Sequence, residues 1–105
     1  AFGMLMDREL PPEVDNAIFE LAMAHSGVTG VHGLRTRRSG IRYVIQLHIE
    51  MPDDIPLLHA HRIADEVEAA LLEKFPGADI IIHQDPHSVI EEEAKLASGA
   101  DQQAC

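Results

Sequence analysis

The sequence predicts an α+β domain of two layers whose elements follow the order α-β-β-α-β. Two segments carry apolar residues at every third or fourth position, and residues 41–51 alternate strictly between apolar and polar side chains. The later strand, helix and strand form a βαβ unit, whose right-handed crossover makes its two strands parallel. We therefore expect a three-stranded mixed sheet with two helices on one face. The other face would be open to solvent or to a partner, and a homodimer across that face or its edge is expected.

The first helix is expected to begin at Pro11 and Pro12, because proline is tolerated in the first helical turn. Its apolar stripe runs to His25, and Ser26-Gly27 ends it. Residues 28–38 predict the first strand, loosened by two glycines, and Ser39-Gly40 predicts a hairpin turn.

The second strand, residues 41–51, is the clearest, with one apolar and one polar face. Pro52 to Pro56 break it and open a long second helix that Phe75-Pro76-Gly77 ends. Residues 78–84 predict the third strand, terminated by Asp85-Pro86. Beyond it we expect at most a short helix through residues 91–96 and then a polar tail.

Composition limits the function. The chain has 105 residues and a formal net charge of −10, with three basic and twelve acidic residues in positions 51–105. This balance repels nucleic acid and anionic membranes and favours cationic ligands. Cys105 is the single cysteine, so an intramolecular disulfide and a cysteine-based zinc site are excluded, and a cytosolic setting is expected. No apolar run is long enough to cross a bilayer.

Seven histidines stand in the chain, and histidine is the commonest protein ligand of transition metals. Because side chains alternate along a strand, His48 faces away from the apolar side, and His83 and Asp85 share one side of their strand. With the isoleucines of that strand turned to the helices, His83 and Asp85 join His48 on the open face. His32 lies on the hairpin partner strand within reach, although the glycines leave its facing undecided.

Imidazole and carboxylate ligands suit zinc, and the same set would accept cobalt, nickel, copper or cadmium. His61, near the start of the second helix, must approach from the side or from another subunit. Gln84 is a candidate for orienting a ligand or a water from outside the ligand set. The competing interpretation is that each histidine is merely a surface or packing residue.

The remaining three histidines are expected to lie outside the central ligand set. His25 stands near a helix C-terminus, where positive charge is favourable, and His59 is expected to be exposed. His87, just after the third strand, is a candidate peripheral ligand. Phosphate-loop, dinucleotide-binding, zinc-protease and nucleophile-elbow motifs are all lacking, which argues against an enzyme or a small-molecule substrate.

Four segments resemble a known family, in order and at matching spacing: GVHGLRTR at 30–37, IQLHIEM at 45–51, AHRIAD at 60–65 and IHQDP at 82–86. Together they resemble the cytoplasmic C-terminal domain of the cation diffusion facilitator family, most closely its bacterial zinc and ferrous-iron efflux subgroup. The resemblance covers about residues 4–90. It implies a metallochaperone-like fold and a cytoplasmic homodimer that binds zinc, with Fe²⁺, Cd²⁺ and Ni²⁺ as other candidate metals.

The resemblance also implies site residues. The zinc ligands of the family fall on His32, His48, His61, His83 and Asp85. Residues 5–7 resemble the junction after the last transmembrane helix, where Asp7 would take part in an inter-subunit charge contact. Relatives carry another residue at His59 and often a cysteine at His87, so the number or selectivity of bound metals can differ here.

These observations give a division into a junction at residues 1–9, a metal-binding dimerisation domain at 10–90 and a flexible tail at 91–105. The expected function is zinc sensing in a transporter, in which binding closes the dimer and the parent's transmembrane domain is the second partner. The alternative is a free-standing carrier or buffer that hands zinc to other proteins. A metal-dependent hydrolase is the third candidate, but the sequence offers it no evident general base.

Overall fold

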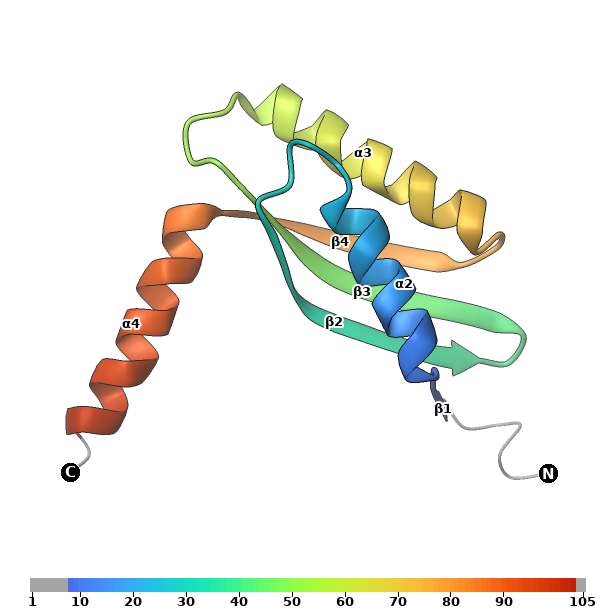
Figure 1. The fold of residues 1–105 in the computed structure, drawn as a ribbon, viewed down its shortest axis with the longest axis horizontal. Coiled ribbons are helices and arrows are strands. Elements are labelled where there is room, and N and C mark those ends of the chain that lie inside the picture. The colour runs from blue at the N-terminus through green and yellow to red at the C-terminus, as the bar shows by residue number, and fades with distance from the viewer. Residues whose placement is uncertain (1–7, 104–105) are drawn as a thin grey trace.

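The computed structural model describes residues 8–103 as a mixed sheet, two helices packed on it and a third helix that projects from it (Figure 1). The elements are β1 (Arg8–Glu9), α2 (Pro12–Met23), β2 (Gly30–Ser39), β3 (Arg42–Met51), α3 (Leu57–Lys74), β4 (Asp79–Pro86) and α4 (His87–Gln103). The expected α-β-β-α-β order is confirmed over α2 to β4. Among the helices of residues 8–103, none has the length and apolar character of a membrane span.

The sheet has the strand order β1-β2-β3-β4. β2 and β3 form the predicted antiparallel hairpin, and β3 and β4 are parallel, as the βαβ crossover requires. The predicted three-stranded mixed sheet is therefore confirmed. The structure adds β1, a two-residue strand that pairs antiparallel with the end of β2.

Both α2 and α3 lie on one face of the sheet (Figure 1). That face is the apolar side of β3, where Ile45, Leu47 and Ile49 are fully buried against Ile18 of α2 and Ile63 of α3. Each such side chain contributes roughly 1.5–3 kcal/mol by leaving water. The polar side of β3 is left without a helix above it, as the alternation predicts.

Local chemistry explains where the packed helices begin and end. Pro12 occupies the first turn of α2, with Glu13 and Asp15 near the positive end of the helix dipole. α3 follows Pro56 and ends with Lys74 in its last turn, where a cation is favourable.

The C-terminal part differs from the expectation in two ways. β4 continues to Pro86, so Asp85 is a strand residue that pairs in register with Glu50 of β3. α4 then runs to Gln103, much further than the short helix expected at residues 91–96. A side chain distant in sequence supports its start, because the Ser88 amide donates a hydrogen bond of 2.9 Å to Asp53 Oδ1. Asp7, expected at an inter-subunit charge contact, lies outside the described residues.

Candidate metal centre

Three histidines on three adjacent strands form a row across the open face of the sheet. His32 of β2 pairs in register with His48 of β3, and His48 pairs with His83 of β4. Their rings stack, with centroids 4.7 Å apart for His32 and His48 and 4.5 Å apart for His48 and His83. These separations match the spacing between neighbouring strands, about 4.7–4.9 Å. Strand register, rather than any loop, therefore brings the imidazoles together.

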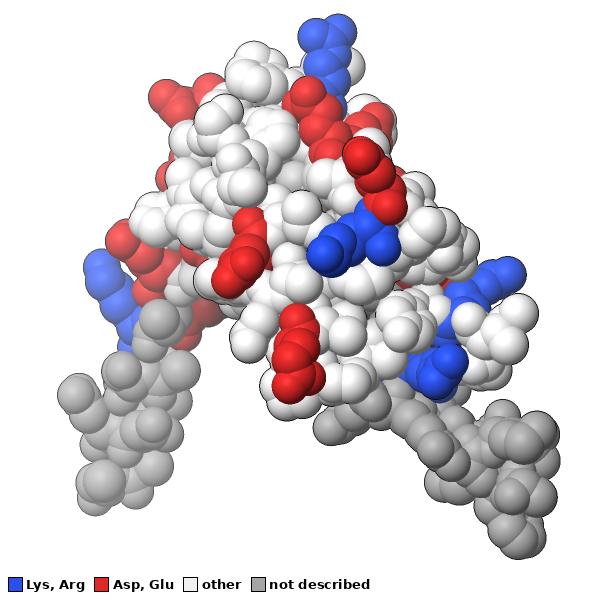
Figure 2. Space-filling model, turned by 45° about the vertical axis from the view of Figure 1, so that its right-hand side comes forward, with Lys and Arg blue, Asp and Glu red and all other residues white. Residues whose placement is uncertain are grey.

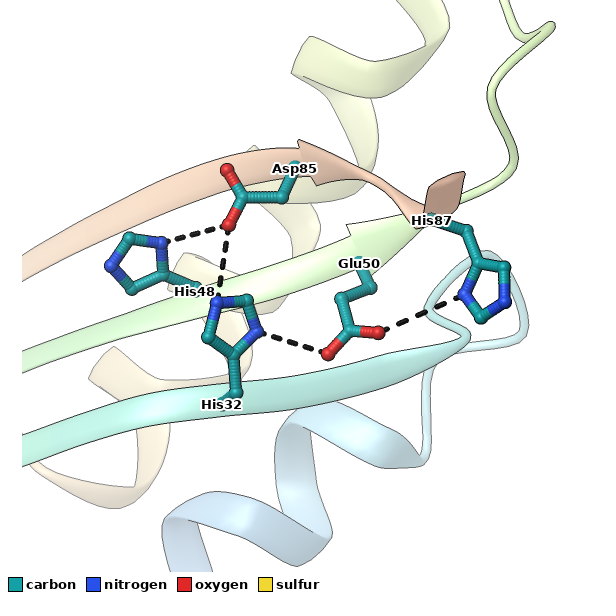
Figure 3. A network of polar contacts seen from close by, with 5 residues as sticks. All are labelled: His32, His48, Glu50, Asp85 and His87. Atoms are coloured by element: carbon teal, nitrogen blue, oxygen red, sulfur yellow. Dashed lines mark hydrogen bonds and ion pairs between the residues drawn. The ribbon is translucent and has the colours of Figure 1, made fainter. Parts of the chain in front are cut away.

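Asp85 joins this row from the end of β4 (Figure 3). Its Oδ2 lies 2.9 Å from His48 Nδ1 and 3.3 Å from His32 Nε2. One ligand atom from each of His32, His48 and Asp85 lies within 4.8 Å of the others, and all three side chains are half-buried. The donors therefore converge on a volume suited to a single ion, and two imidazoles with a carboxylate are the ligand types that zinc and related divalent metals accept.

Glu50 holds His32 from the other side. Its Oε2 lies 2.9 Å from His32 Nδ1, and its side chain is only 13% exposed. An ionised carboxylate only accepts hydrogen bonds, so His32 Nδ1 carries the proton in this contact. In the neutral ring, Nε2 is then unprotonated and presents its lone pair to the site. A carboxylate behind a histidine ligand is the usual arrangement for orienting the ring and making it a stronger donor.

Two glycines of β2 make room for these side chains. A Cβ added at Gly30 would lie 2.8 Å from Glu50 Oε1, and one at Gly33 would lie 2.8 Å from His48 Cδ2. Gly33 also has a φ of +62°, at the irregularity in the pairing of β2 with β3 between His32 and Arg35. The glycines that weaken the sequence pattern of this strand are therefore what lets the row of histidines approach it.

Two of the expected site residues lie elsewhere in the single chain. His61 is on α3, 63% exposed, with Nε2 3.1 Å from Asp65 Oδ2. Gln84 shares the helix-facing side of β4 with Ile80 and Ile82, and lines a surface hollow with His61 and two exposed leucines. The structure thus brings His32, His48, His83 and Asp85 together and places His61 and Gln84 beside each other at a separate position.

The other histidines have separate surroundings. His25 accepts a hydrogen bond of 2.9 Å from the Gly27 amide and lies 3.0 Å from Glu66 Oε1 of α3, and His59 is exposed. His87, the first residue of α4, has Nδ1 3.8 Å from Glu50 Oε1 and Nε2 3.3 Å from Glu91 Oε1.

Glu50 is the site residue that sequence reasoning missed. Strand parity places it on the polar face with His48, but as one of several acidic residues it carries no distinguishing signal. The signal available is its position two residues from His48 and opposite Asp85, once the third strand is extended by two residues.

Comparison with known proteins identifies relatives along most of the chain. A family model described as the cytoplasmic domain of cation efflux proteins matches residues 10–87. The cation-efflux pump FieF of Pectobacterium carotovorum is 55% identical over 92 residues, which are 88% of this chain and 31% of the pump. FieF of Escherichia coli K12 is 52% identical over 95 residues, 90% of this chain and 32% of the pump. The chain therefore spans about a third of the length of the curated relatives it matches.

Solved structures agree with the fold. The zinc form of CzrB, described as a zinc transporter, superposes with a TM-score of 0.71 at 38% identity and covers 79% of this chain and 96% of that one. A MamM CTD structure has a TM-score of 0.68 at 28% identity, covering 72% of this chain and 96% of that one. The metallochaperone-like α+β fold that the sequence resemblance implied is confirmed.

Proposed function

This chain belongs to the family of cation efflux proteins, as their cytoplasmic domain, and from that membership we propose that it is the zinc-binding regulatory and homodimerisation domain of a cation diffusion facilitator transporter. In this proposal, cytoplasmic divalent metal binds on the open sheet face and closes the dimer. The observation that carries it is the convergence of His32, His48 and Asp85.

The spacing within that cluster supports metal binding over simple hydrogen bonding. With the proton of His32 held on Nδ1 by Glu50, Nε2 of the neutral ring has no hydrogen to give Asp85, yet the two atoms are 3.3 Å apart. Ligand atoms of a tetrahedral zinc ion, with bonds of about 2.0–2.1 Å, lie about 3.3–3.4 Å from each other. Zn²⁺ is our proposal, and Fe²⁺, Cd²⁺ and Ni²⁺ fit the same donors. His83, stacked on His48, extends the ligand set.

The position of His61 supports a site completed by a second subunit. It projects from α3 beside Leu57 and Leu58, which are 82% and 60% exposed. Exposed apolar side chains next to a metal-binding type of residue suit a contact between subunits. In a two-fold dimer each subunit would present His61 toward the metal row of its partner, so that both sites are completed symmetrically.

Charge provides the reason for closure. Each chain carries a formal −10, so two chains repel each other. A divalent ion bound near the subunit boundary adds positive charge where that repulsion acts, and it favours a compact dimer over a splayed one. In a whole transporter the compaction would be passed on to the transmembrane domain.

A zinc titration by calorimetry, with light scattering for mass and small-angle X-ray scattering for size, tests this proposal. We expect a dimer that binds zinc and becomes more compact. The double variant His48→Ala, Asp85→Asn should weaken binding by roughly 100-fold or more, because it removes two converging donors. His59→Ala, an exposed histidine on α3, is the matched control and should leave binding unchanged.

Two results would count against the proposal. Unaltered affinity in the double variant would move the metal away from the sheet face. Tight zinc binding to a monomer, with fast exchange to a chelator and no compaction, would instead favour the carrier or buffer function.

A further inference from the structure

A second group of cation-binding side chains lies where the sheet meets α4. His87 is the first residue of α4, Glu50 lies at the end of β3, and Glu91 is one turn along the helix from His87 (Figure 3). His87 is 50% exposed, so water and ions reach it, while Glu50 is 13% exposed. None of the atoms that face each other here belongs to the cluster of His32, His48 and Asp85.

The contacts assign the proton of the His87 ring. Nε2 lies 3.3 Å from Glu91 Oε1, close enough for Nε2–H to donate, whereas Nδ1 lies 3.8 Å from Glu50 Oε1, too far for a hydrogen bond. A neutral His87 therefore carries its proton on Nε2 and turns the lone pair of Nδ1 toward Glu50. The arrangement matches that of His32, in which one ring nitrogen is held by a carboxylate and the other is left free to ligate.

Two electron-pair donors that face each other without a hydrogen between them are stabilised by a cation. The 3.8 Å separation is slightly wider than the about 3.3–3.4 Å between ligands of a tetrahedral zinc ion, so a small rotation of the exposed His87 ring closes it. Glu50, Glu91 and the nearby Asp53 surround His87 with negative charge, which also favours a divalent ion.

We propose that Glu50 Oε1 and His87 Nδ1 are the protein ligands of a second divalent-cation position, completed by water, with Glu91 positioning the His87 ring. With two protein ligands it binds more weakly than the sheet site. An ion there joins β3 directly to the first residue of α4, so that occupancy fixes how the projecting helix leaves the sheet. The proposal is separate from the function proposed above, and either can fail alone.

Zinc titrations of the full chain, followed by calorimetry and native mass spectrometry, test the second position. We expect His87→Ala to bind one zinc ion fewer than the unaltered chain, with its tighter binding intact. Glu91→Gln should weaken that one equivalent by about 10–100-fold, because it removes the carboxylate that orients the ring. Glu92→Gln, a neighbouring exposed acid on α4, is the matched control and should change neither stoichiometry nor affinity.

The outcomes separate the two proposals. An unchanged zinc stoichiometry in His87→Ala overturns the second position and leaves the sheet site standing. Loss of the tighter binding in His48→Ala, Asp85→Asn, with the equivalent that depends on His87 retained, shows that the two positions are independent. Equal unfolding temperatures of the unaltered chain and His87→Ala in chelator confirm that the substitution acts on the metal and not on the fold.

Discussion

Gly33 determines how closely the row of histidines can approach β2. Its φ of +62° is a conformation that residues with a side chain rarely adopt, and its missing Cβ leaves space for the His48 ring. Gly40, in the hairpin turn, has nearly the same φ of +64°, but a Cβ there would meet no described heavy atom within 4 Å. The two glycines thus separate backbone strain from crowding of the site.

We expect Gly33→Ala and Gly40→Ala to lower the free energy of unfolding by similar amounts, about 1–2 kcal/mol each, because both force alanine into the left-handed region. Only Gly33→Ala should also weaken zinc binding, by about tenfold or more, since its Cβ displaces His48. Chemical denaturation in chelator and zinc calorimetry measure the two effects. Equal zinc affinity in the two variants would show that the His48 ring tolerates the displacement.

How far the site can be predicted from sequence depends on strand parity. Parity places His48, His83 and Asp85 on one face, and the structure has them there. It leaves His32 undecided, because the irregular pairing at Gly33 interrupts the alternation of β2. It does not distinguish Glu50, whose role arises from a contact with a residue 18 positions away on the neighbouring strand.

At the level of elements, α2, β3 and α3 follow from periodicity because each buries one face in the core. The length of α4 exceeds the expectation because its composition is polar and its start is held by Asp53, 35 residues before Ser88. β1 could not be foreseen, since two residues are too short to show a pattern and its pairing is with the distant end of β2. Features held by contacts between distant residues leave little trace in local sequence.

The support that Asp53 gives α4 predicts a pH dependence. The hydrogen bond from the Ser88 backbone lowers the pKa of Asp53 below its ordinary value of 3.8, with a smaller contribution from His87. A lowered pKa in the folded chain means that this stabilisation is complete above the ordinary value and is lost as the pH falls through the lowered one. The start of α4 should therefore loosen in acid and not in base.

Amide hydrogen exchange at Ser88 measures this effect. At neutral pH we expect Asp53→Ala to lower the protection of that amide, while Asp54→Ala, its exposed neighbour, leaves it unchanged. Once the pH is below the lowered pKa, the unaltered chain and Asp53→Ala should show the same protection. A difference that persists in strong acid would show that another group holds the helix.

For the molecule as a whole, the decisive property is its negative charge. Figure 2 shows acidic side chains scattered over the surface rather than gathered in one place. Two copies therefore repel across any shared boundary, and the repulsion extends over the Debye length, about 10 Å at 0.1 M salt and about 3 Å at 1 M.

This repulsion predicts that zinc compacts the dimer more at low salt than at high salt. In chelator, added salt alone should reduce the radius of gyration of the dimer, because it screens the charge that zinc otherwise offsets. Small-angle scattering with and without zinc at 0.1 M and 1 M salt measures both effects. A zinc-induced compaction of equal size in the two salts would assign closure to direct ligand bridging instead.

The separation of the site residues along the chain has a consequence for the lifetime of the fold. His48 and Asp85 are 37 positions apart and meet only when β4 has paired with β3, which is a late, long-range event in folding. An ion held between them stabilises contacts that are absent from the earlier stages. Bound metal should therefore do little to hasten folding and much to slow unfolding, so a loaded domain persists longer than an empty one although both form at similar rates.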